Sequence, residues 1–402
     1  MSKINELIKE LCPNGVRYNK LSEIGNQFSG LSGKSKNDFE NGNCKYITYT
    51  NIYNNPSTNL DVEDYVQVKE NEKQNEIKYK DILVAGSSEN LEDSGMISVV
   101  TKEPSEKIYL NSFCFGFRLN DNFYDKYNPD FLKHIFRDKN FRNEIISCSF
   151  GVTRYNLSKK KFLKIKIPCP PLEVQEEIVK ILDKFGELEA ELEAELEARK
   201  NQYELWRGKL LNKKNNNYKK YNITEICKSI SAGGDVPEDT IKGISKSQDD
   251  YKYPVISNGV GENAIYGYSK NYRVDVQSCV TIAARGTIGY HEVRYGKFTP
   301  IIRLITLIPD EKIISAKYLH YALYGHEFKP SGGSIPQLTT PTVKQLDLII
   351  PPIEEQNRIV GILDKFDKLV NDITDGLPAE IELRRQQFEY YRNKLLSFEE
   401  VL

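Results

Sequence analysis

Residues that commonly hold metals are scarce in this sequence of 402 residues, which has seven cysteines and four histidines. The cysteines are scattered and never form a Cys-x-x-Cys pair, and the histidines lack metal-ligand spacing. These absences argue against a metal site and against a disulfide framework. We therefore expect reduced thiols that pack as small apolar side chains, as is typical of cytosolic proteins.

Long apolar runs are also absent. No stretch approaches the ~20 consecutive apolar residues that a membrane-spanning helix requires. The first residues, MSKINELIKELCPNG, are charged and contain no apolar signal core. With 39% hydrophobic and 28% charged residues, the composition is that of a soluble globular protein, and we expect it to be cytoplasmic.

Motifs of common catalytic sites are missing as well. Gly33-Lys34-Ser35 resembles the end of a phosphate-binding loop, but Phe28 occupies the position of the required glycine five residues earlier. Asn54-Asn55-Pro56-Ser57 does not match the Asn-Pro-Pro-Tyr type of segment that marks amino-methyltransferases. We expect no catalytic residue, no metal and no cofactor in this chain.

What the sequence does contain is a duplication. The segment IVKILDKF at residues 178–185 returns as IVGILDKF at residues 359–366, an offset of 181, and 11 of the 16 positions from Pro170 to Phe185 are identical in the two copies. A third match, residues 199–211 with residues 384–396, has 7 identities in 13 positions and an offset of 185. The second copy is therefore four residues longer, which is about one helical turn.

The first copy has the periodicity of a long amphipathic helix. Apolar residues recur at spacings of three, four or seven from Leu172 to Leu211, directly after a pair of prolines. The second copy also follows a proline pair and ends at Leu396, but Gly376 and Pro378 predict a break near residues 375–378. We expect these helices to pack through Gln175, Ile178, Ile181, Leu182, Phe185, Leu188, Leu192, Leu196, Tyr203, Trp206, Gln356, Ile359, Ile362, Leu363, Phe366, Phe388 and Tyr391.

Residues 187–198 read ELEAELEAELEA, three copies of one four-residue unit. Its glutamates repel one another at i, i+4, and its leucines form a narrow stripe that needs a partner. We predict that the partner is the helix of the other copy, packed antiparallel as a coiled coil; the alternative is a solvated acidic helix. For Trp206, the only tryptophan, two interpretations stay open, core packing and a surface offered to a partner, and we favour core packing.

Charge is segregated along a chain whose net charge is only −1. Ten acidic residues and two lysines between Glu173 and Ala198 give this stretch a local charge of −8, which leaves +7 for the remainder. Residues 151–171 hold Arg154 and five lysines but no acidic residue. A stretch of this kind suits a phosphate backbone, although a solvated surface explains it equally well.

The segments outside the helices have the composition of mixed sheet domains. We predict strands at residues 45–51, 82–85, 113–119, 280–284 and 301–308, and short helices at residues 131–136 and 318–324. The predicted fold class is α+β. Two globular α/β domains, residues 1–170 and 213–350, are separated by two long antiparallel helices in residues 171–212 and 351–402, with an internal pseudo-two-fold repeat.

In this arrangement the chain resembles the specificity subunit of type I restriction-modification systems. The resemblance covers essentially the whole chain and rests on CPNGV at residues 12–16, the loops GVTRYNL and GGSIPQL, the segments PPLEVQ and PPIEEQ, and the tails RKNQYELWRGKLL and RRQQFEYYRNKLL. It implies a non-catalytic subunit whose two target recognition domains each read one half of a bipartite site in double-stranded DNA. It also implies that the helices set the gap between the half-sites, with the ELEA repeat as spacer.

The resemblance further implies partners. Two methyltransferase subunits would dock on the helices, restriction subunits would follow, and S-adenosylmethionine, ATP and Mg would belong to those partners. Two alternatives remain open at this point. One is a single-chain enzyme that embeds the same recognition domains, and the other is a purely structural adaptor.

Base reading in the major groove needs side chains that present paired donors or acceptors, and loops on a rigid frame are where such side chains occur. Glycine and serine that only turn the chain, and Asn or Thr that cap an element, are the structural alternative for each position. The candidates in the first domain are Ser29, Ser32, Lys34, Lys36, Thr48, Thr50, Asn51, Ser87, Ser88, Thr153, Arg154, Tyr155, Lys159, Lys160 and Lys161. Those in the second domain are Gly233, Ser257, Asn258, Arg285, Thr287, Ser334 and Gln337.

Overall fold

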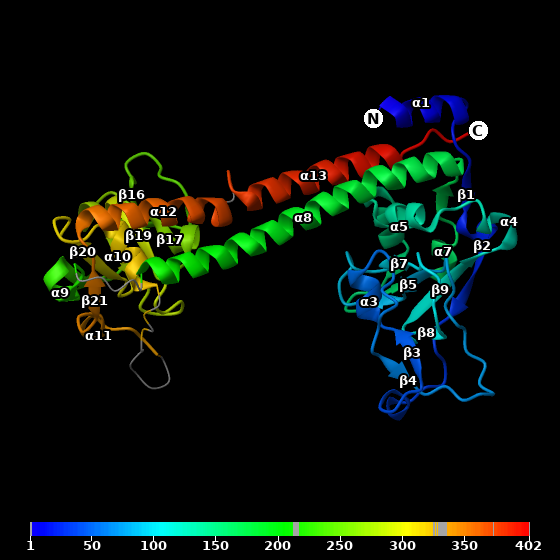
Figure 1. Ribbon diagram of the computed structural model, residues 1–402, viewed down its shortest axis with the longest axis horizontal. Helices are drawn as coiled ribbons and strands as arrows, with labels where there is room; N and C mark the ends of the chain where they lie inside the picture. Colours follow the sequence, from blue (N-terminus) through cyan, green and yellow to red (C-terminus); the bar gives the residue numbers. More distant parts are fainter. Residues whose placement is uncertain are drawn as a thin grey trace. The chain divides into compact units, whose positions relative to one another are not determined.

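The computed structural model describes residues 2–211, 217–324, 326, 328, 336–372 and 374–401. The chain forms two compact units (Figure 1): unit 1 is Met1–Ala194 with Glu380–Leu402, and unit 2 is Glu195–Ala379. Both mix helices and sheets, which confirms the predicted α+β class. One helix of 40 residues, α8 (Leu172–Leu211), contributes its first part to unit 1 and its remainder to unit 2.

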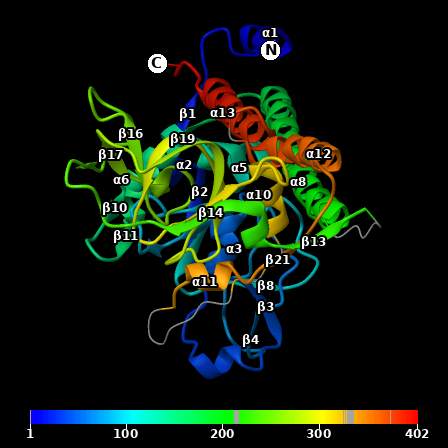
Figure 2. The same cartoon turned by 90° about the vertical axis from the view of Figure 1, so that its left-hand side faces the viewer.

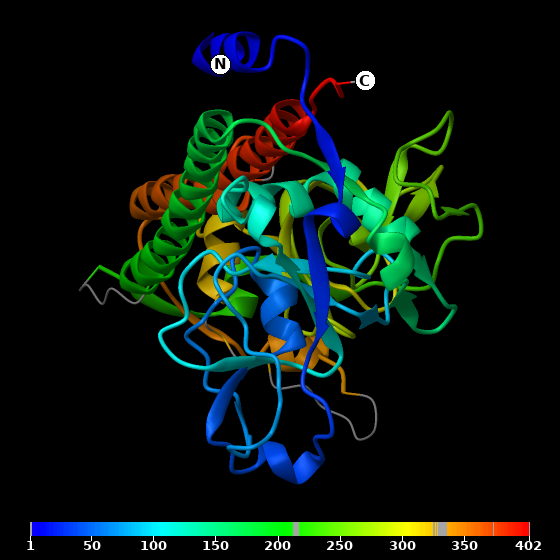
Figure 3. The ribbon, with the colours of Figure 1, turned by 90° about the vertical axis from the view of Figure 1, so that its right-hand side faces the viewer.

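Unit 1 is built around the four-stranded sheet β2-β9-β5-β7, with smaller ladders beside it (Figure 3). Its strands are β1 (Tyr18–Lys20), β2 (Gly25–Ser29), β3 (Cys44–Ile47), β4 (Tyr65–Val66), β5 (Ile82–Ala85), β6 (Ser87–Ser88), β7 (Ile97–Val99), β8 (Ile108–Leu110), β9 (Cys114–Leu119), β10 (Ser149–Phe150), β11 (Tyr155–Leu157) and β12 (Lys166–Pro168). Its helices, besides α8, are α1 (Ser2–Leu11), α2 (Leu21–Ile24), the 3-10 helix η1 (Lys36–Phe39), α3 (Tyr49–Asn54), α4 (Asp121–Tyr124), α5 (Pro129–Arg137), α6 (Lys139–Ser147), α7 (Lys159–Phe162) and most of α13 (Leu377–Leu396).

Unit 2 is built around the seven-stranded sheet β14-β20-β18-β19-β16-β17-β15 (Figure 2). Its strands are β13 (Lys219–Asn222), β14 (Cys227–Ala232), β15 (Ile241–Lys242), β16 (Tyr253–Ile256), β17 (Ile265–Ser269), β18 (Val274–Ile282), β19 (His291–Pro300), β20 (Ile305–Pro309) and β21 (Asp347–Ile350). Its helices are α9 (Ile223–Ile226), the 3-10 helix η2 (Gly261–Ala264), α10 (Ala316–Leu323), α11 (Thr340–Val343) and α12 (Ile353–Asn371).

The duplication extends to the backbone of the two units. An antiparallel pair opens and closes each globular part, β1 with β12 in unit 1 and β13 with β21 in unit 2. In unit 1 the Leu21 N–H donates to the Ile165 carbonyl at 2.9 Å, and in unit 2 the Ile223 N–H donates to the Leu346 carbonyl at 2.9 Å. Because Ile165 and Leu346 are again 181 positions apart, the faint sequence parallel between the domains corresponds to one shared frame.

The predicted strand at residues 82–85 and the helices in the regions of residues 131–136 and 318–324 are confirmed as β5, α5 and α10. The strand at residues 113–119 corresponds to β9, and the strand at residues 280–284 matches only the end of β18, which begins at Val274 and ends at Ile282. Two further strand predictions are wrong in part. The strand at residues 45–51 ends at Ile47, because the Thr48 hydroxyl accepts from the Asn51 N–H and starts α3. The strand at residues 301–308 begins only at Ile305, because Ile302 and Arg303 turn the chain with φ values of 53° and 61°.

The predicted long helix is confirmed as α8, with the predicted bounds. In the second copy the helix is interrupted between α12, which ends at Asn371, and α13, which begins at Leu377. The observed break, between Asn371 and Leu377, overlaps the predicted position near residues 375–378. The four additional residues of the second copy are accommodated at this break. The Gly376 N–H donates to the Asp372 carbonyl at 3.0 Å within this turn.

Within unit 1, α8 packs against α13 (Figure 1). The Phe185 ring lies 5.3 Å from the Tyr391 ring and 6.1 Å from the Phe388 ring. Further along α8, Glu189 pairs with Arg385 at 2.6 Å, and Arg385 also pairs with Glu193. Positions rise along α8 while their partners fall along α13, so the predicted antiparallel packing is confirmed here, and Arg385 offsets the repulsion between the glutamates.

Unit 2 repeats this packing with other side chains. The Tyr203 ring of α8 lies 6.3 Å from the Phe366 ring of α12, and Ile359 and Leu363 are buried in the unit 2 core. Tyr203 corresponds to Phe388 and Phe366 to Phe185, so an aromatic pair is kept in both units. The core interpretation of Trp206 is wrong, because its side chain is 42% exposed and has the Lys209 ammonium 5.7 Å above its ring.

A buried glutamine fixes the start of each repeated helix. In unit 1 the Gln175 amide donates to the Lys126 carbonyl at 2.8 Å and to the Pro170 carbonyl at 2.7 Å, and its oxygen accepts from the Asn128 N–H at 2.9 Å. Asn128 is the N-cap of α5. The Gln175 side chain, which has no exposed surface, thereby joins the start of α8 to the first turn of α5.

An aspartate of the repeated LDKF segment makes the second connection. Asp183 accepts from Lys133 Nζ at 3.0 Å and contacts His134 Nε2 at 2.8 Å, both on α5. Burial by itself would raise the pKa of Asp183, but the hydrogen bonds from His134 and Lys133 outweigh burial and lower this pKa to about 2. Its counterpart Asp364 pairs with Lys317 of α10.

We expect this aspartate to make unit 1 acid-sensitive. A carboxylate whose pKa is lowered by folding stabilises the protein above its unfolded pKa of ~3.9, and this contribution is lost as the pH falls toward 2. Because the Asp183 side chain is 40% exposed, we expect Asp183→Asn to cost only about 1 kcal/mol at pH 7. Urea unfolding of both proteins from pH 7 to pH 3 should show this difference shrinking below pH 4, whereas a constant difference would contradict the assignment.

Candidate nucleic-acid interface

The GVTRYNL loop of unit 1 is the tip of a hairpin between β10 and β11. Gly151 turns the chain with a φ of +127°, and a Cβ at this position would lie 2.1 Å from the Arg154 carbonyl oxygen, so glycine is required here. Val152 is 87% exposed at the tip, and Thr153 and Arg154 are also exposed. The tip therefore presents side chains to solvent.

The hairpin lies beside the end of strand β5. Strand β11 pairs with β6, so that Tyr155 is opposite Ser88. Arg154 Nη2 donates to the Ser87 hydroxyl at 3.1 Å, and the guanidinium lies 5.7 Å from the centre of the Phe113 ring, a side chain that is 64% exposed. The predicted sites at Ser87-Ser88 and Arg154 thus meet around one open cavity of about 380 Å³, whose walls also include Tyr49, Tyr53, Glu89, Asn90, Asp93 and Phe113. From the predicted segment 48–51, only Tyr49 lines this cavity.

Two of the candidates at residues 48–51 are used to shape the local backbone. Thr48 is the N-cap of α3. Asn51 is 8% exposed, and its amide donates to the Asn59 carbonyl at 2.8 Å while its oxygen accepts from the Asn59 N–H at 3.2 Å. Thr50 is exposed and has no such role in the frame. Of the three candidates in this segment, Thr50 has the side chain that is free to meet a ligand.

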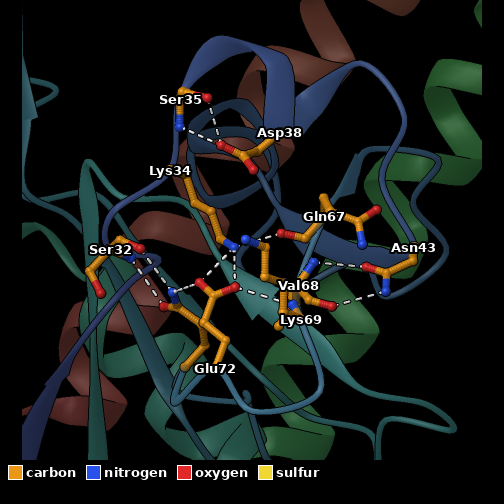
Figure 4. Close-up of polar contacts among 10 residues, drawn as sticks. Ser32, Lys34, Ser35, Asp38, Asn43, Gln67, Val68, Lys69 and Glu72 are labelled. Carbon is orange, nitrogen blue, oxygen red and sulfur yellow. Dashed lines mark hydrogen bonds and ion pairs between the residues drawn. The ribbon is translucent and has the colours of Figure 1, made fainter.

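The loop at residues 29–36 is held by a buried ion pair (Figure 4). Lys34 Nζ donates to the Gln67 carbonyl and to Glu72, both at 2.6 Å, and the Lys34 side chain is only 5% exposed. The hydrogen bond from Lys34, with others from Gln74 and the Lys69 N–H, lowers the pKa of Glu72 to about 2. Lys34 therefore positions the loop, and the exposed candidates that it leaves on the surface are Ser29, Ser32 and Lys36.

The basic stretch that follows the hairpin forms α7, with Ser158 as its N-cap. Lys159, Lys160 and Lys161 are all exposed. The Lys159 ammonium lies 4.8 Å from the Phe115 ring, and none of the three lysines forms an ion pair with a carboxylate of the described chain. Such lysines match the electrostatic requirement of a phosphate backbone.

In unit 2 most of the predicted residues meet at one place. Asn258 accepts from the Ala284 N–H at 2.8 Å, and the Thr287 hydroxyl donates to the Asn258 carbonyl at 2.7 Å. Arg285 donates to the Gln337 side-chain oxygen from Nε at 3.3 Å and from Nη2 at 3.1 Å. Asn258 and Thr287 are thus used to shape the turn, while Arg285 is exposed and is held by a neutral partner.

The remaining candidates of unit 2 are structural or lie outside the described residues. A Cβ at Gly233 would lie 2.7 Å from the Pro300 carbonyl carbon, so this glycine permits a close approach of two backbones. The Ser257 hydroxyl donates to the Ala264 carbonyl at 3.2 Å. Ser334 lies outside the residues that the structure describes.

Sequence reasoning missed the aromatic part of the unit 1 surface. Phe113, Phe150 and Tyr53 are 64%, 59% and 37% exposed. Phe113 lies in a predicted strand, where an aromatic side chain is expected to be buried, and only the tertiary structure shows these three rings on the surface. An exposed ring beside a guanidinium, as for Phe113 and Arg154, is a combination that stacks on bases of a nucleic acid.

The chemistry of these surfaces is that of binding. In the described part of the chain, no group of three or more His, Cys, Asp or Glu side chains is placed to hold a metal ion. Over the same residues, no helix combines the length and the apolarity needed to cross a membrane. Donors from Arg, Lys and Ser on loop tips, carried by two copies of one frame, define a duplicated binding protein.

Comparison with known proteins identifies the family. Residues 13–198 and 215–383 match the type I restriction modification DNA specificity domain, so the chain belongs to that family. A protein of Mycoplasma pneumoniae named as a type I specificity subunit is 36% identical over 287 residues, which are 67% of this chain and 82% of the relative. The specificity subunit of the EcoR124I/EcoR124II type I restriction enzyme of Escherichia coli is 35% identical over 275 residues, 60% of this chain and 64% of the relative.

Solved structures share the fold. A chain from a structure of type I restriction-modification complex assembly superposes with a TM-score of 0.63 at 16% identity, over 96% of this chain and 98% of that chain. The specificity subunit from Thermoanaerobacter tengcongensis gives a TM-score of 0.53 at 16% identity, over 96% of each chain. The α+β fold with two specificity domains is thereby confirmed.

Proposed function

We propose that this chain is the DNA-specificity subunit of a type I restriction-modification complex, with unit 1 and unit 2 each binding one half of a bipartite site in double-stranded DNA. One observation carries the proposal. The two units keep the same frame, down to hydrogen bonds between equivalent backbone atoms, but place different side chains on the equivalent exposed loops. Two copies of one reader with different contacts match two different half-sites.

The partners follow from the family. We propose that two methyltransferase subunits dock on the helices α8, α12 and α13, and that restriction subunits join the complex. S-adenosylmethionine, ATP and Mg would then bind to those partners, and this chain would contribute recognition. A complex that acts on chromosomal DNA would work in the cytoplasm. The domain bounds 1–170 and 213–350 stay predictions for the two readers.

A methylation assay separates this proposal from its alternatives. We expect the purified chain to transfer no methyl group from labelled S-adenosylmethionine to DNA, and the complex with its methyltransferase subunits to methylate one bipartite motif. Turnover by the chain alone would favour a single-chain enzyme. A complex that assembles but methylates or retains no specific duplex would favour a structural adaptor.

A further inference from the structure

Each unit contains an equivalent backbone hydrogen bond within its own candidate binding surface. In unit 1 the Leu157 N–H donates to the Gly86 carbonyl at 3.0 Å, and in unit 2 the Leu338 N–H donates to the Ala284 carbonyl at 2.9 Å. Leu157 and Leu338 are 181 positions apart, the offset of the duplication. Each accepting carbonyl lies just beyond an inner sheet strand, β5 in unit 1 and β18 in unit 2. These contacts identify equivalent places in the two readers.

An arginine lies at this place in both units, but on opposite sides of the contact. In unit 1 it comes from the loop, where Arg154 precedes Leu157, and it bonds to Ser87 on the strand side. In unit 2 it comes from the strand side, where Arg285 follows Ala284, and it bonds to Gln337 on the loop side. A guanidinium is therefore retained while its point of attachment has changed, which is expected if the group itself is needed at this position.

Both guanidinium groups are free to bind a further ligand. Each is exposed, and each is held by a neutral oxygen, while neither forms an ion pair with a carboxylate of any described residue. A guanidinium has five N–H donors. The Ser87 hydroxyl accepts from one N–H of Arg154, on Nη2. The Gln337 side-chain oxygen accepts from two N–H groups of Arg285, one on Nε and one on Nη2. Among the residues that the structure describes, no further bond is made by Nη1 of either arginine or by the second N–H on Nη2.

The geometry favours base reading over phosphate binding. A group that only neutralises phosphate needs no fixed plane, and the exposed lysines of α7 supply such charge in unit 1. Arg154 is instead oriented by the Ser87 hydroxyl and by the Phe113 ring 5.7 Å away, and Arg285 by two bonds to one amide oxygen. A planar group with paired free donors is the form in which arginine binds O6 and N7 of guanine in the major groove.

We propose that Arg154 and Arg285 are the paired specificity-determining residues of the two readers and that each contacts one guanine, Arg154 in the half-site of unit 1 and Arg285 in that of unit 2. This inference rests on the proposed function. Ser87, Phe113 and Gln337 are positioning residues, since they orient a guanidinium without reaching the base. Asn258 and Thr287 shape the turn that carries Arg285.

The test uses the complete complex of this chain with its methyltransferase subunits, and sequencing of methylated genomic DNA as the readout. We expect the wild-type motif to contain a guanine in each half. Arg154→Ala should relax one guanine position in one half only, and Arg285→Ala one position in the other half only, each with about 10- to 100-fold weaker binding to the cognate duplex. The unchanged half-site shows in each case that the complex is folded.

The lysine variants distinguish the two kinds of DNA contact. Arg154→Lys and Arg285→Lys keep the charge but lose the planar pair of donors, so we expect the same loss of guanine preference as in the alanine variants. The inference would be overturned if the lysine variants kept the wild-type preference for guanine. It would also be overturned if the variants bound all sequences more weakly to the same degree, with a salt dependence of binding reduced by about one phosphate contact.

The proposed function and this inference fail in different ways. A wild-type complex without any specific motif would refute the proposed function. A wild-type complex with a bipartite motif, in which a half-site lacks guanine or keeps its base preferences in the alanine variant, would refute the inference alone.

Discussion

Removal of one ELEA unit from α8 should shorten the preferred gap between the half-sites by about one to two base pairs, because four residues are about 6 Å of helix and the DNA rise is ~3.4 Å. We expect methylation of the original motif to fall by at least about 100-fold, since a reader held at the wrong distance loses the contacts of its half-site, and each mismatched base pair already costs about 1 to 3 kcal/mol. Both half-site sequences should be unchanged. Sequencing of methylated DNA from cells with the variant complex measures gap and motif together.

The sequence of the repeat makes this deletion a clean one. The three copies are identical, so the product is the same whichever copy is removed, and glutamates remain at the two positions that pair with Arg385. A matched insertion of one further ELEA unit should lengthen the gap by the same amount. Altered half-site bases, or an unchanged gap, would show that α8 does not set the spacing.

Gln356→Leu should lower the free energy of unfolding of unit 2 by about 3 kcal/mol. The Gln356 amide donates to the Ile313 carbonyl at 2.7 Å and to the Pro351 carbonyl at 2.9 Å, and its oxygen accepts from the Ser315 N–H at 3.1 Å. The side chain has no exposed surface. Leucine fills a similar volume but leaves two carbonyl groups and one N–H buried without partners.

The single tryptophan makes the measurement specific to one unit. Trp206 belongs to unit 2, so its fluorescence follows the unfolding of that unit in urea, whereas far-ultraviolet circular dichroism follows the whole chain. We expect Gln356→Leu to move the fluorescence transition and the equivalent Gln175→Leu to move it less. Gln386→Leu, an exposed glutamine of α13, is the control and should change stability by no more than about 0.5 kcal/mol. A shift as small as that of the control would contradict the role of Gln356.

The frame of the protein was predictable because its signals are local or repeated. A spacing of three and four residues defines α8, proline and glycine define where helices start and break, and one offset of 181 links segments that take equivalent places in the two units. The antiparallel pairing of α8 with α13 in unit 1 was predictable because the leucine stripe of residues 187–198 needs a partner and its glutamates repel one another. The buried roles of Gln175 and Gln356 are consistent with their identity in the two copies, but their hydrogen-bond partners were not predictable.

The binding surface was predictable only as a set of loops. Lys34, Asn51 and Asn258 have the chemistry of base readers, but their polar groups are used by Glu72, Asn59 and the Ala284 N–H. Phe113 has the chemistry of a core residue but is on the surface. The prediction that Trp206 packs in the core was wrong for the same reason, since its position in the helix repeat gives no information on which residues cover it.

The sequence by itself determined the duplication, the helical frame and the family resemblance, because those depend on residue spacing along one chain. Only the tertiary structure decided which polar side chains are free to bind. Hydrogen bonds such as those of Arg154 to Ser87 and of Arg285 to Gln337 join residues 67 and 52 positions apart. Whether a donor is satisfied within the protein or left for a ligand depends on such distant partners, and no local pattern encodes them.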